Sequence, residues 1–253
     1  MIRRFFFVLC ISMVGLSVHA RLTHRYSFND GSAKDSAGNV DGKLNGGAKV
    51  VDKQLVLDND GMTSDGAQLS YLEFASPILP ESGSATVMVW FTAKKDAGEF
   101  ARLVNIGDHD SGRGVNFIYM TARTNTEKAR CAIGTDSTTR IPVDNDRLDE
   151  DQEHMLTLVI DGDAKKLHVY VDGKESAAAE DLGDNTLDKV RQVDRWLGRS
   201  SFDRDPGLCG SINEFRVYDH ALSADEISAA NDVGADALPA TSAATTQPAN
   251  KKS

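Results

Sequence analysis

Short segments in which apolar and polar residues alternate follow one another along most of the chain, separated by Gly, Pro, Ser, Asp and Asn. Alternation with a period of two is typical of half-buried β-strands. The segments are residues 26–28, 55–57, 68–74, 85–91, 102–106, 115–121, 130–133, 155–160, 167–171 and 212–218. Tight-turn dipeptides at 161–162 and 172–173 (Asp-Gly) follow two of them. About ten to twelve short, evenly spaced strands predict an all-β sandwich or barrel.

One short segment near the end of this pattern has a helical signature. Ser223 followed by Glu226 forms a capping box, in which each side chain bonds the backbone amide of the other residue. Ile227 and Ala230 then provide a single apolar stripe. A helix this short is marginal alone, so we expect it to pack on the sheets.

The first twenty residues resemble an export signal. Arg3 and Arg4 precede an apolar stretch over residues 5–18, and Val18-His19-Ala20 offers small residues where signal peptidase cuts. The alternative is an uncleaved anchor, but the stretch is short for a membrane span. We therefore predict a signal peptide over residues 1–20, a mature chain beginning at Arg21 that does not insert in the membrane, and a secreted, periplasmic or cell-envelope location.

The last twenty residues differ in composition from the rest. Ala, Thr, Ser, Pro and Gln dominate residues 234–253, and no apolar period continues there. Such a stretch buries too little surface to offset the entropy of ordering it. The sequence therefore predicts one β-domain over residues 21–233 and a disordered, low-complexity tail over residues 234–253.

Charge and cysteine content limit the partners and the chemistry. The formal charge of −10 becomes −12 once Arg3 and Arg4 are removed. An acidic protein disfavours nucleic acid and anionic membranes as partners and is compatible with divalent cations. Cys131 and Cys209 remain after signal cleavage. In an oxidising compartment they either form a disulfide or stay as two buried thiols, and the sequence leaves both open.

Several motifs, in their order and spacing, carry a family resemblance. These are Tyr-Ser-Phe-Asn-Asp at 26–30, Asp-Ser-Ala-Gly-Asn at 35–39, the two strands and turns of 158–174, and Gly-Ser-Ile-Asn-Glu-Phe-Arg-Val-Tyr-Asp-His at 210–220. Together they resemble the laminin-G-like jelly rolls of the concanavalin-A-like lectin/glucanase superfamily. The resemblance implies an antiparallel two-sheet β-sandwich, a jelly roll, with one short C-terminal helix.

A calcium ion is the cofactor that residues and resemblance suggest. Strand alternation places Asp30 on the inward face with Phe28, and Asn213 on the inward face with Phe215. A shared calcium ion would satisfy both oxygen side chains, and relatives often join their first and last strands in this way. The alternative is that Asp30 and Asn213 bond loop amides.

The sequence contains no clear set of catalytic residues. Glycoside hydrolases need two carboxylates that project together into a cleft. The best match is the acidic run 149–153, but its interposed residue is also polar, which indicates a solvated loop. We therefore expect no catalytic residues. A polysaccharide hydrolase or lyase remains the least favoured of three functions.

Two polar loops, residues 107–113 and 200–205, are the candidate ligand surface, because loops on a rigid scaffold carry function. The candidate binding residues are Asp108, His109, Trp196, Arg199, Phe202 and Arg204. The sequence thus predicts a secreted, non-catalytic module that binds a glycan or an extracellular protein. The alternative is a structural or protein-binding component of the cell envelope.

Overall fold

The computed structural model describes residues 21–95, 97–135 and 140–239. The predicted signal peptide, residues 1–20, and residues 240–253 of the predicted tail lie outside the described residues.

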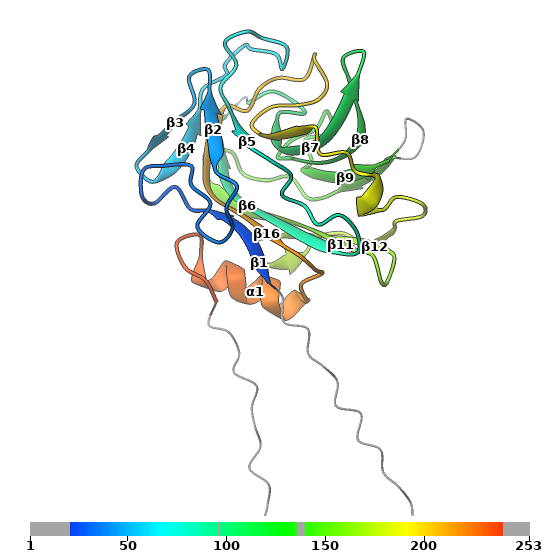
Figure 1. Ribbon diagram of the computed structural model, residues 1–253. Helices are drawn as coiled ribbons and strands as arrows, with labels where there is room; N and C mark the ends of the chain where they lie inside the picture. Colours follow the sequence, from blue (N-terminus) through cyan, green and yellow to red (C-terminus); the bar gives the residue numbers. More distant parts are fainter. Residues whose placement is uncertain (1–20, 96, 136–139, 240–253) are drawn as a thin grey trace, which may run out of the picture.

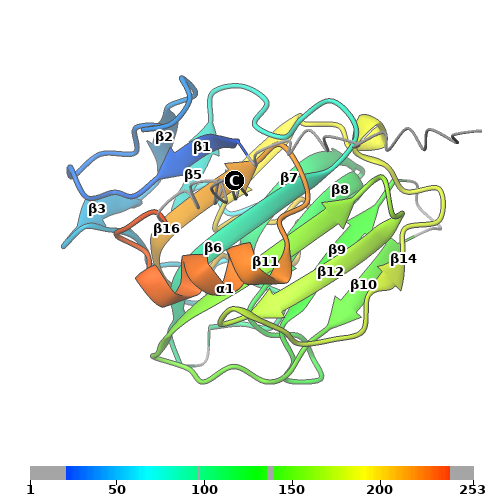
Figure 2. The same ribbon diagram turned by 90° about the horizontal axis from the view of Figure 1, so that it is seen from below.

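Two antiparallel sheets stack face to face, and one helix packs on the outer side of the first sheet (Figures 1 and 2). Sheet A contains β1 (Leu22–Tyr26), β3 (Lys49–Val51), β4 (Gln54–Leu57), β6 (Ala85–Ala93), β11 (Glu153–Asp161), β12 (Lys166–Val171), β13 (Lys174–Glu175), β14 (Glu180–Asp181) and β16 (Gly210–Tyr218). Sheet B contains β2 (Gly42–Asn45), β5 (Tyr71–Phe74), β7 (Arg102–Asp110), β8 (Arg113–Thr121), β9 (Arg130–Gly134), β10 (Arg140–Asp144) and β15 (Asp194–Leu197). The helices are η1 (Leu187–Lys189) and α1 (Ala224–Val233). The predicted two-sheet sandwich with one short C-terminal helix is confirmed.

The strand order brings the two ends of the domain together. Sheet A runs β13-β12-β11-β6-β16-β4-β3, with β1 paired to β16 and β14 paired to β12. Sheet B runs β10-β9-β8-β7-β15-β5-β2. The pairing of β1 with β16 places Leu22 opposite Tyr218 and Tyr26 opposite Phe215. The first and last strands are therefore neighbours.

The main core lies between the sheets and consists of the inward residues of each alternating strand. Three aromatic rings meet at its centre: Tyr26 lies 4.9 Å from Phe74, and Phe74 lies 5.3 Å from Phe215, between ring centroids. Offset and tilted aromatic pairs stabilise a core beyond the area that they bury. They come from both sheets, so they hold the two layers in contact.

A second apolar cluster lies on the outer face of sheet A, where α1 covers it. Ile227 and Ala230 of the helix are buried beside Trp90 and Met155 of the sheet. The predicted capping box is present: the Glu226 amide donates to Ser223 Oγ at 3.3 Å, and the Ser223 amide donates to Glu226 Oε2 at 2.8 Å. The helix thus gains its stability from a cap at its start and from packing along one face.

The packed part of the chain continues past residue 233, where composition predicted the domain to end. Ala235 is buried. The Arg216 guanidinium donates to the carbonyl oxygens of Ala235 at 2.8 Å and Ala237 at 2.7 Å, and Arg25 donates to that of Asp236 at 3.3 Å. Buried arginines need acceptors, and this backbone supplies them. A composition average over the whole tail hides these few residues.

The disulfide that the sequence left open is not formed, because Cys131 and Cys209 are both free thiols. Cys131 lies in the middle of β9 in sheet B and is fully buried in the core. Cys209 lies directly before β16 of sheet A, with its sulfur 3.5 Å from Asp58 Oδ1. Burial raises the pKa of both thiols, which makes them poor nucleophiles.

In the part of the chain that the structure describes, no helix has the length and apolar character required to cross a bilayer.

Candidate binding site

A continuous row of side chains crosses the outer face of sheet B from one edge to the other. Strand register places these residues side by side: Lys43, Glu73, Trp196, Asn105, Tyr119, Ala132 and Pro142. Their chain neighbours Leu72, Leu197 and Ile118 point the other way, into the main core. The row therefore belongs to the face that turns away from sheet A.

The loop between β15 and β16 covers the middle of this row. Phe202 packs edge-on against Phe117, with ring centroids 5.7 Å apart. The Arg102 guanidinium lies 3.9 Å from the centroid of the Tyr119 ring and forms an ion pair with Asp205 at 2.8 Å. Arg102 and Tyr119 are almost completely buried as a result, so this part of the face is not available to a ligand.

Buried hydrogen bonds hold the covering loop in place. Ser201 Oγ accepts from Asn105 Nδ2 at 2.6 Å and donates to Asp194 Oδ2 at 2.7 Å. The same Asp194 oxygen lies 2.8 Å from His109 Nδ1. Although Ser, His and Asp meet here, the serine bonds the carboxylate and not the imidazole, and Ser201 is buried. A nucleophile needs the base as its own partner, so the arrangement is structural.

The part of the row nearest β2 and β5 remains open. Here the Arg199 guanidinium lies 4.4 Å from the centroid of the Trp196 ring and 4.8 Å from that of Tyr71. The two rings meet edge to face at 6.0 Å. Tyr71 and Arg199 are half-buried, and Trp196 is only 8% exposed. We call Tyr71, Trp196 and Arg199 the arginine platform.

The six predicted binding residues separate into two groups. Trp196 and Arg199 meet in the arginine platform. Phe202 is part of the covering loop, and Arg204 is exposed on that loop.

Asp108 and His109 lie near the end of β7 and are already paired. Asp108 forms an ion pair with Arg191 at 3.2 Å, and His109 contacts Asp194. His109 supports the covering loop through Asp194, whereas Asp108 binds the segment before β15. Both lie on β7, the neighbour of β15, but the β7 residue opposite Trp196 is Asn105.

Tyr71 is the platform residue that sequence reasoning missed. The alternation of residues 68–74 puts Tyr71 and Glu73 on one face of a strand. Nothing in the sequence shows that this strand pairs with β15, more than a hundred residues later. The sequence therefore predicts the strand that carries Tyr71, but not the strand with which it pairs.

Asp30 and Asn213 do not have the positions predicted for a shared calcium ion. Asp30 is exposed, since Phe28 has a left-handed backbone (φ 55°) that ends the strand alternation. Its carboxylate accepts from the Ser32 amide at 2.9 Å and from Ser32 Oγ at 2.7 Å. This is the loop-capping alternative.

At Asn213 the inward alternation of β16 is interrupted by a bulge. The register shifts between Ile212 and Glu214, and Asn213 Nδ2 donates to Glu153 Oε2 at 2.6 Å. Asn213 therefore has a side-chain partner on β11 in place of the predicted inward position. Binding of calcium by Asp30 and Asn213 stays a prediction.

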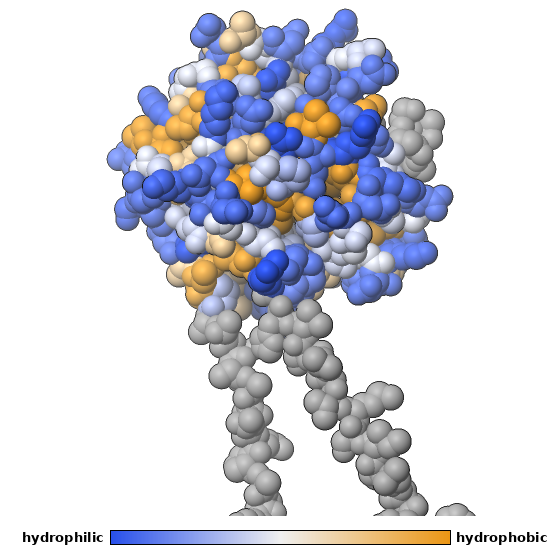
Figure 3. Space-filling model, in the orientation of Figure 1, coloured by the Kyte–Doolittle hydropathy of each residue, from blue (hydrophilic) through white to orange (hydrophobic). Residues whose placement is uncertain are grey.

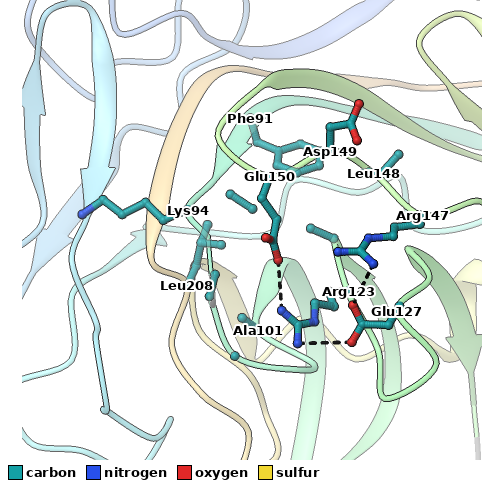
Figure 4. Close-up of a pocket in the computed structure, with 14 residues that line it drawn as sticks. Phe91, Lys94, Ala101, Arg123, Glu127, Arg147, Leu148, Asp149, Glu150 and Leu208 are labelled. Carbon is teal, nitrogen blue, oxygen red and sulfur yellow. Dashed lines mark hydrogen bonds and ion pairs between the residues drawn. The ribbon is translucent and has the colours of Figure 1, made fainter.

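The acidic run 149–153 borders a small cavity at one end of the sandwich, between the sheets (Figure 4). Arg123 bridges Glu150 at 3.0 Å and Glu127 at 3.2 Å above an apolar floor. The cavity volume is about 20 Å³, enough for about one water molecule. A sugar unit does not fit, and Glu150 is held in an ion pair.

Two more acids of this run, Asp151 and Glu153, have structural partners. Asp151 Oδ1 accepts from the Lys95 amide at 3.3 Å, and Glu153 bonds Asn213. Figure 4 shows the Asp149 carboxylate pointing away from the Arg123 cluster. The run thus forms loop contacts rather than a facing pair of carboxylates.

Several solved structures of low sequence identity share this fold. Domain 4 of AbnA, a GH43 extracellular arabinanase from Geobacillus stearothermophilus in complex with arabinotriose, matches with TM-score 0.59 and 20% identity over 83% of this chain and 97% of that one. The Ruminococcus gnavus IT-sialidase CBM40 bound to α2,3-sialyllactose matches with TM-score 0.50 and 19% identity over 58% and 82%. The binding domain of botulinum neurotoxin serotype D/C VPI 5993 matches with TM-score 0.63 and 10% identity over 84% and 52%. At these identities the likeness shows the fold alone.

No curated protein matches the sequence. The family model described as the concanavalin A-like lectin/glucanases superfamily, a laminin-G type, matches residues 65–228. That match covers more than half of the chain and includes β5, β16 and all of the strands between them. The chain therefore belongs to the concanavalin A-like lectin/glucanase superfamily.

Proposed function

We propose that the protein is a secreted, non-catalytic module that binds carbohydrate on the outer face of sheet B, at the arginine platform. The observation that carries this proposal is the platform itself: two aromatic rings on paired strands, with a planar cation from the segment directly after β15 beside them. Aromatic faces and edges suit the apolar faces of sugar rings, and planar polar groups suit their hydroxyls.

Rigidity supports a binding role for these residues. Trp196 lies in β15, between β5 and β7, and Tyr71 lies in β5. Side chains held by paired strands lose little conformational entropy when a ligand arrives. A glycan could therefore be bound without reorganising the sheet.

The face drawn in Figure 3 suits a polar ligand better than a broad apolar partner. Its apolar residues form small groups separated by hydrophilic ones. Protein-docking surfaces usually have a larger contiguous apolar core. This supports the glycan reading over the protein-binding alternative, in which Tyr, Trp and Arg would serve as hot-spot residues.

Two relatives in fold give the proposal a precedent. Domain 4 of the arabinanase is described in complex with arabinotriose, and the CBM40 domain is bound to sialyllactose. Both are modules that accompany enzymes. The acidic run 149–153 of this chain is engaged in loop contacts, which supports a non-catalytic role here as well.

A glycan array with the wild-type protein and Tyr71→Ala tests the proposal. We expect the wild type to bind a defined set of oligosaccharides and Tyr71→Ala to weaken binding about tenfold, or about 1.4 kcal/mol, by removing half of the ring surface. His168→Ala, on the outer face of sheet A, is the matched control and should bind normally. An empty array, or equal losses in both variants, would contradict the proposal. Capture of a protein ligand that depends on Tyr71 would favour the alternative.

A further inference from the structure

Arg199 occupies the position from which a sugar ring would stack on Trp196. Its guanidinium carbon lies 4.4 Å from the centroid of the Trp196 ring, and only 8% of Trp196 is exposed. A ligand that approaches this part of sheet B therefore meets a guanidinium backed by aromatic rings, rather than a bare ring face. Stacking on aromatic faces holds an arginine flat and leaves its edge donors available.

No carboxylate neutralises Arg199 in the described structure. By contrast, Arg102 of β7 pairs with Asp205, and Arg191, which precedes β15, pairs with Asp108. Arg199 forms no ion pair with any of the residues that the structure describes between 21 and 239. Its Nε is buried without an acceptor, whereas its terminal nitrogens are not among the buried unpaired atoms. The terminal nitrogens of this half-buried side chain therefore face solvent.

Three charged side chains lie at this end of the row, and their formal charges sum to +1: Arg199, Lys43 of β2 and Glu73 of β5. Lys43 lies directly opposite Glu73 in the strand register, and Glu73 lies opposite Trp196. The whole chain carries −10, so general electrostatic attraction cannot bring an anion here. An anion that binds must be recognised by direct contact.

We infer that Arg199 recognises the carboxylate of an acidic sugar, of the uronic or sialic type, in the glycan that the protein binds. The planar guanidinium fork matches a planar carboxylate with two parallel hydrogen bonds, and the ring of the same sugar then lies against Tyr71. This inference rests on the proposed function and narrows it to carboxylated glycans.

Titration calorimetry with paired probes tests the inference. The probes are a galacturonic acid trimer against its methyl ester, and sialyllactose against its sialic acid methyl ester. Each pair differs only in whether the carboxyl group is free or esterified. We expect at least one acid probe to bind at least tenfold more tightly than its neutral partner. Arg199→Gln should remove that preference, and Arg199→Lys should retain only part of it, because an ammonium group lacks the planar fork.

Arg21→Gln is the control, since Arg21 is an exposed arginine on the helix side of sheet A, away from the platform, and should change affinity less than twofold. Thermal unfolding of each variant must match the wild type, which separates lost recognition from lost folding. Equal binding of acid and neutral probes, unchanged in Arg199→Gln, would overturn the inference and leave the proposed function standing. An equal loss in Arg21→Gln would also overturn it. Failure to bind any glycan on the array would instead overturn the proposed function.

Discussion

At the scale of single residues, Asp35 organises the loop that follows β1. Its side chain has no solvent exposure and accepts from the amides of Arg25 at 3.0 Å, Gly38 at 2.9 Å and Val40 at 3.1 Å, while His24 Nδ1 lies 2.7 Å away. Burial alone would raise the pKa of Asp35, but these hydrogen bonds together hold the pKa below its usual value. One ionised carboxylate thus fixes a turn of six residues.

We expect Asp35→Asn to lower the free energy of unfolding by about 2–3 kcal/mol at neutral pH, because amides lose a charged acceptor. A carboxylate whose folded-state pKa is depressed stabilises above its unfolded pKa, about 3.9. That contribution disappears as the pH falls through the lower folded pKa. Denaturant titrations at pH 7 and pH 3 should therefore show the gap between wild type and Asp35→Asn narrowing at pH 3.

Asp163→Asn, at an exposed aspartate in the turn between β11 and β12, serves as the control and should stay within about 0.5 kcal/mol of the wild type. A constant gap at both pH values would mean that the Asp35 charge is not what stabilises this loop.

The Asp-Ser-Ala-Gly-Asn motif that carried the family resemblance has a physical reason at this scale. A Cβ atom on Gly38 would lie 2.6 Å from Asp35 Oδ2 and 2.6 Å from the Thr23 carbonyl oxygen. Only glycine lets the backbone approach the carboxylate this closely. The motif therefore predicts a structural loop from the sequence alone. The contact between its carboxylate and the half-buried His24 is visible only in the structure.

At the scale of elements, β16 has different chemistry on its two faces. Phe215 and Val217 enter the main core, while Glu214 and Arg216 face α1 and are also fully buried. The Arg216 guanidinium lies 4.4 Å from the Trp90 ring centroid and pairs with Glu214 at 2.5 Å. Arg25 of β1 pairs with the same carboxylate at 2.6 Å. β16 thus joins the first strand, the helix and the residues after the helix.

Arg216→Met should lower the free energy of unfolding by about 3–5 kcal/mol, because Glu214 would lose one of its two cationic partners in a buried site. The variant should also make the chain after α1 more susceptible to limited proteolysis, since the carbonyl oxygens of residues 235 and 237 lose their donor. Lys166→Met, which removes an exposed pair with Asp181, should cost less than about 1 kcal/mol. Similar decreases in the free energy of unfolding for the two variants would show that burial of the Arg216–Glu214 pair does not determine how much it stabilises the fold.

Elements differed in how well the sequence predicted them, and burial explains the difference. The long strands β6, β8, β11 and β16 show clear apolar patterns because most of their residues are buried. β13 and β14 have two exposed residues each, too few to show any period. The bulge at Asn213 inverts the expected face at that position, and no residue type there announces it.

At the scale of the whole molecule, the sandwich is held together without a covalent bond between its sheets. Cys131 belongs to sheet B and Cys209 precedes the last strand of sheet A, and both are free. The roughly 4 kcal/mol that a disulfide closing so long a loop would add is therefore absent. Packing between the sheets and the hydrogen-bonded ladders carry the stability instead.

A thiol assay checks this directly. In a protein that begins at Arg21, unfolding in denaturant without reductant should release two thiols per chain, and Cys209→Ser should release one. In the native state Cys131 should react very slowly, because it is fully buried and burial raises its pKa. The melting temperature should be the same with and without reductant. Release of no thiols, or a melting temperature that falls with reductant, would show that the disulfide forms.

The candidate site shows where prediction from sequence ended. Trp196 and Arg199 lie three residues apart, so their selection as binding residues needed no knowledge of the fold. Tyr71 joins them only because β5 and β15 pair in sheet B. Phe202 was selected for its loop but serves to cover Phe117. The long-range pairing of strands decides these outcomes, and alternation along one strand does not reveal it.

The position of the chain ends determines how the protein can be attached to anything else. The Arg21 amide donates to Asp219 Oδ1 at 3.3 Å, and residues 235 and 237 are bonded to Arg216, so both ends of the described chain lie on the helix side of sheet A (Figure 1). The arginine platform lies on the outer face of the opposite sheet. Both chain ends are therefore on the side of the domain opposite the platform. A fusion partner, an affinity tag or a sensor surface attached at either end would leave the platform accessible. Immobilised protein should retain its glycan affinity whichever end is used, a practical advantage of bringing β1 and β16 together.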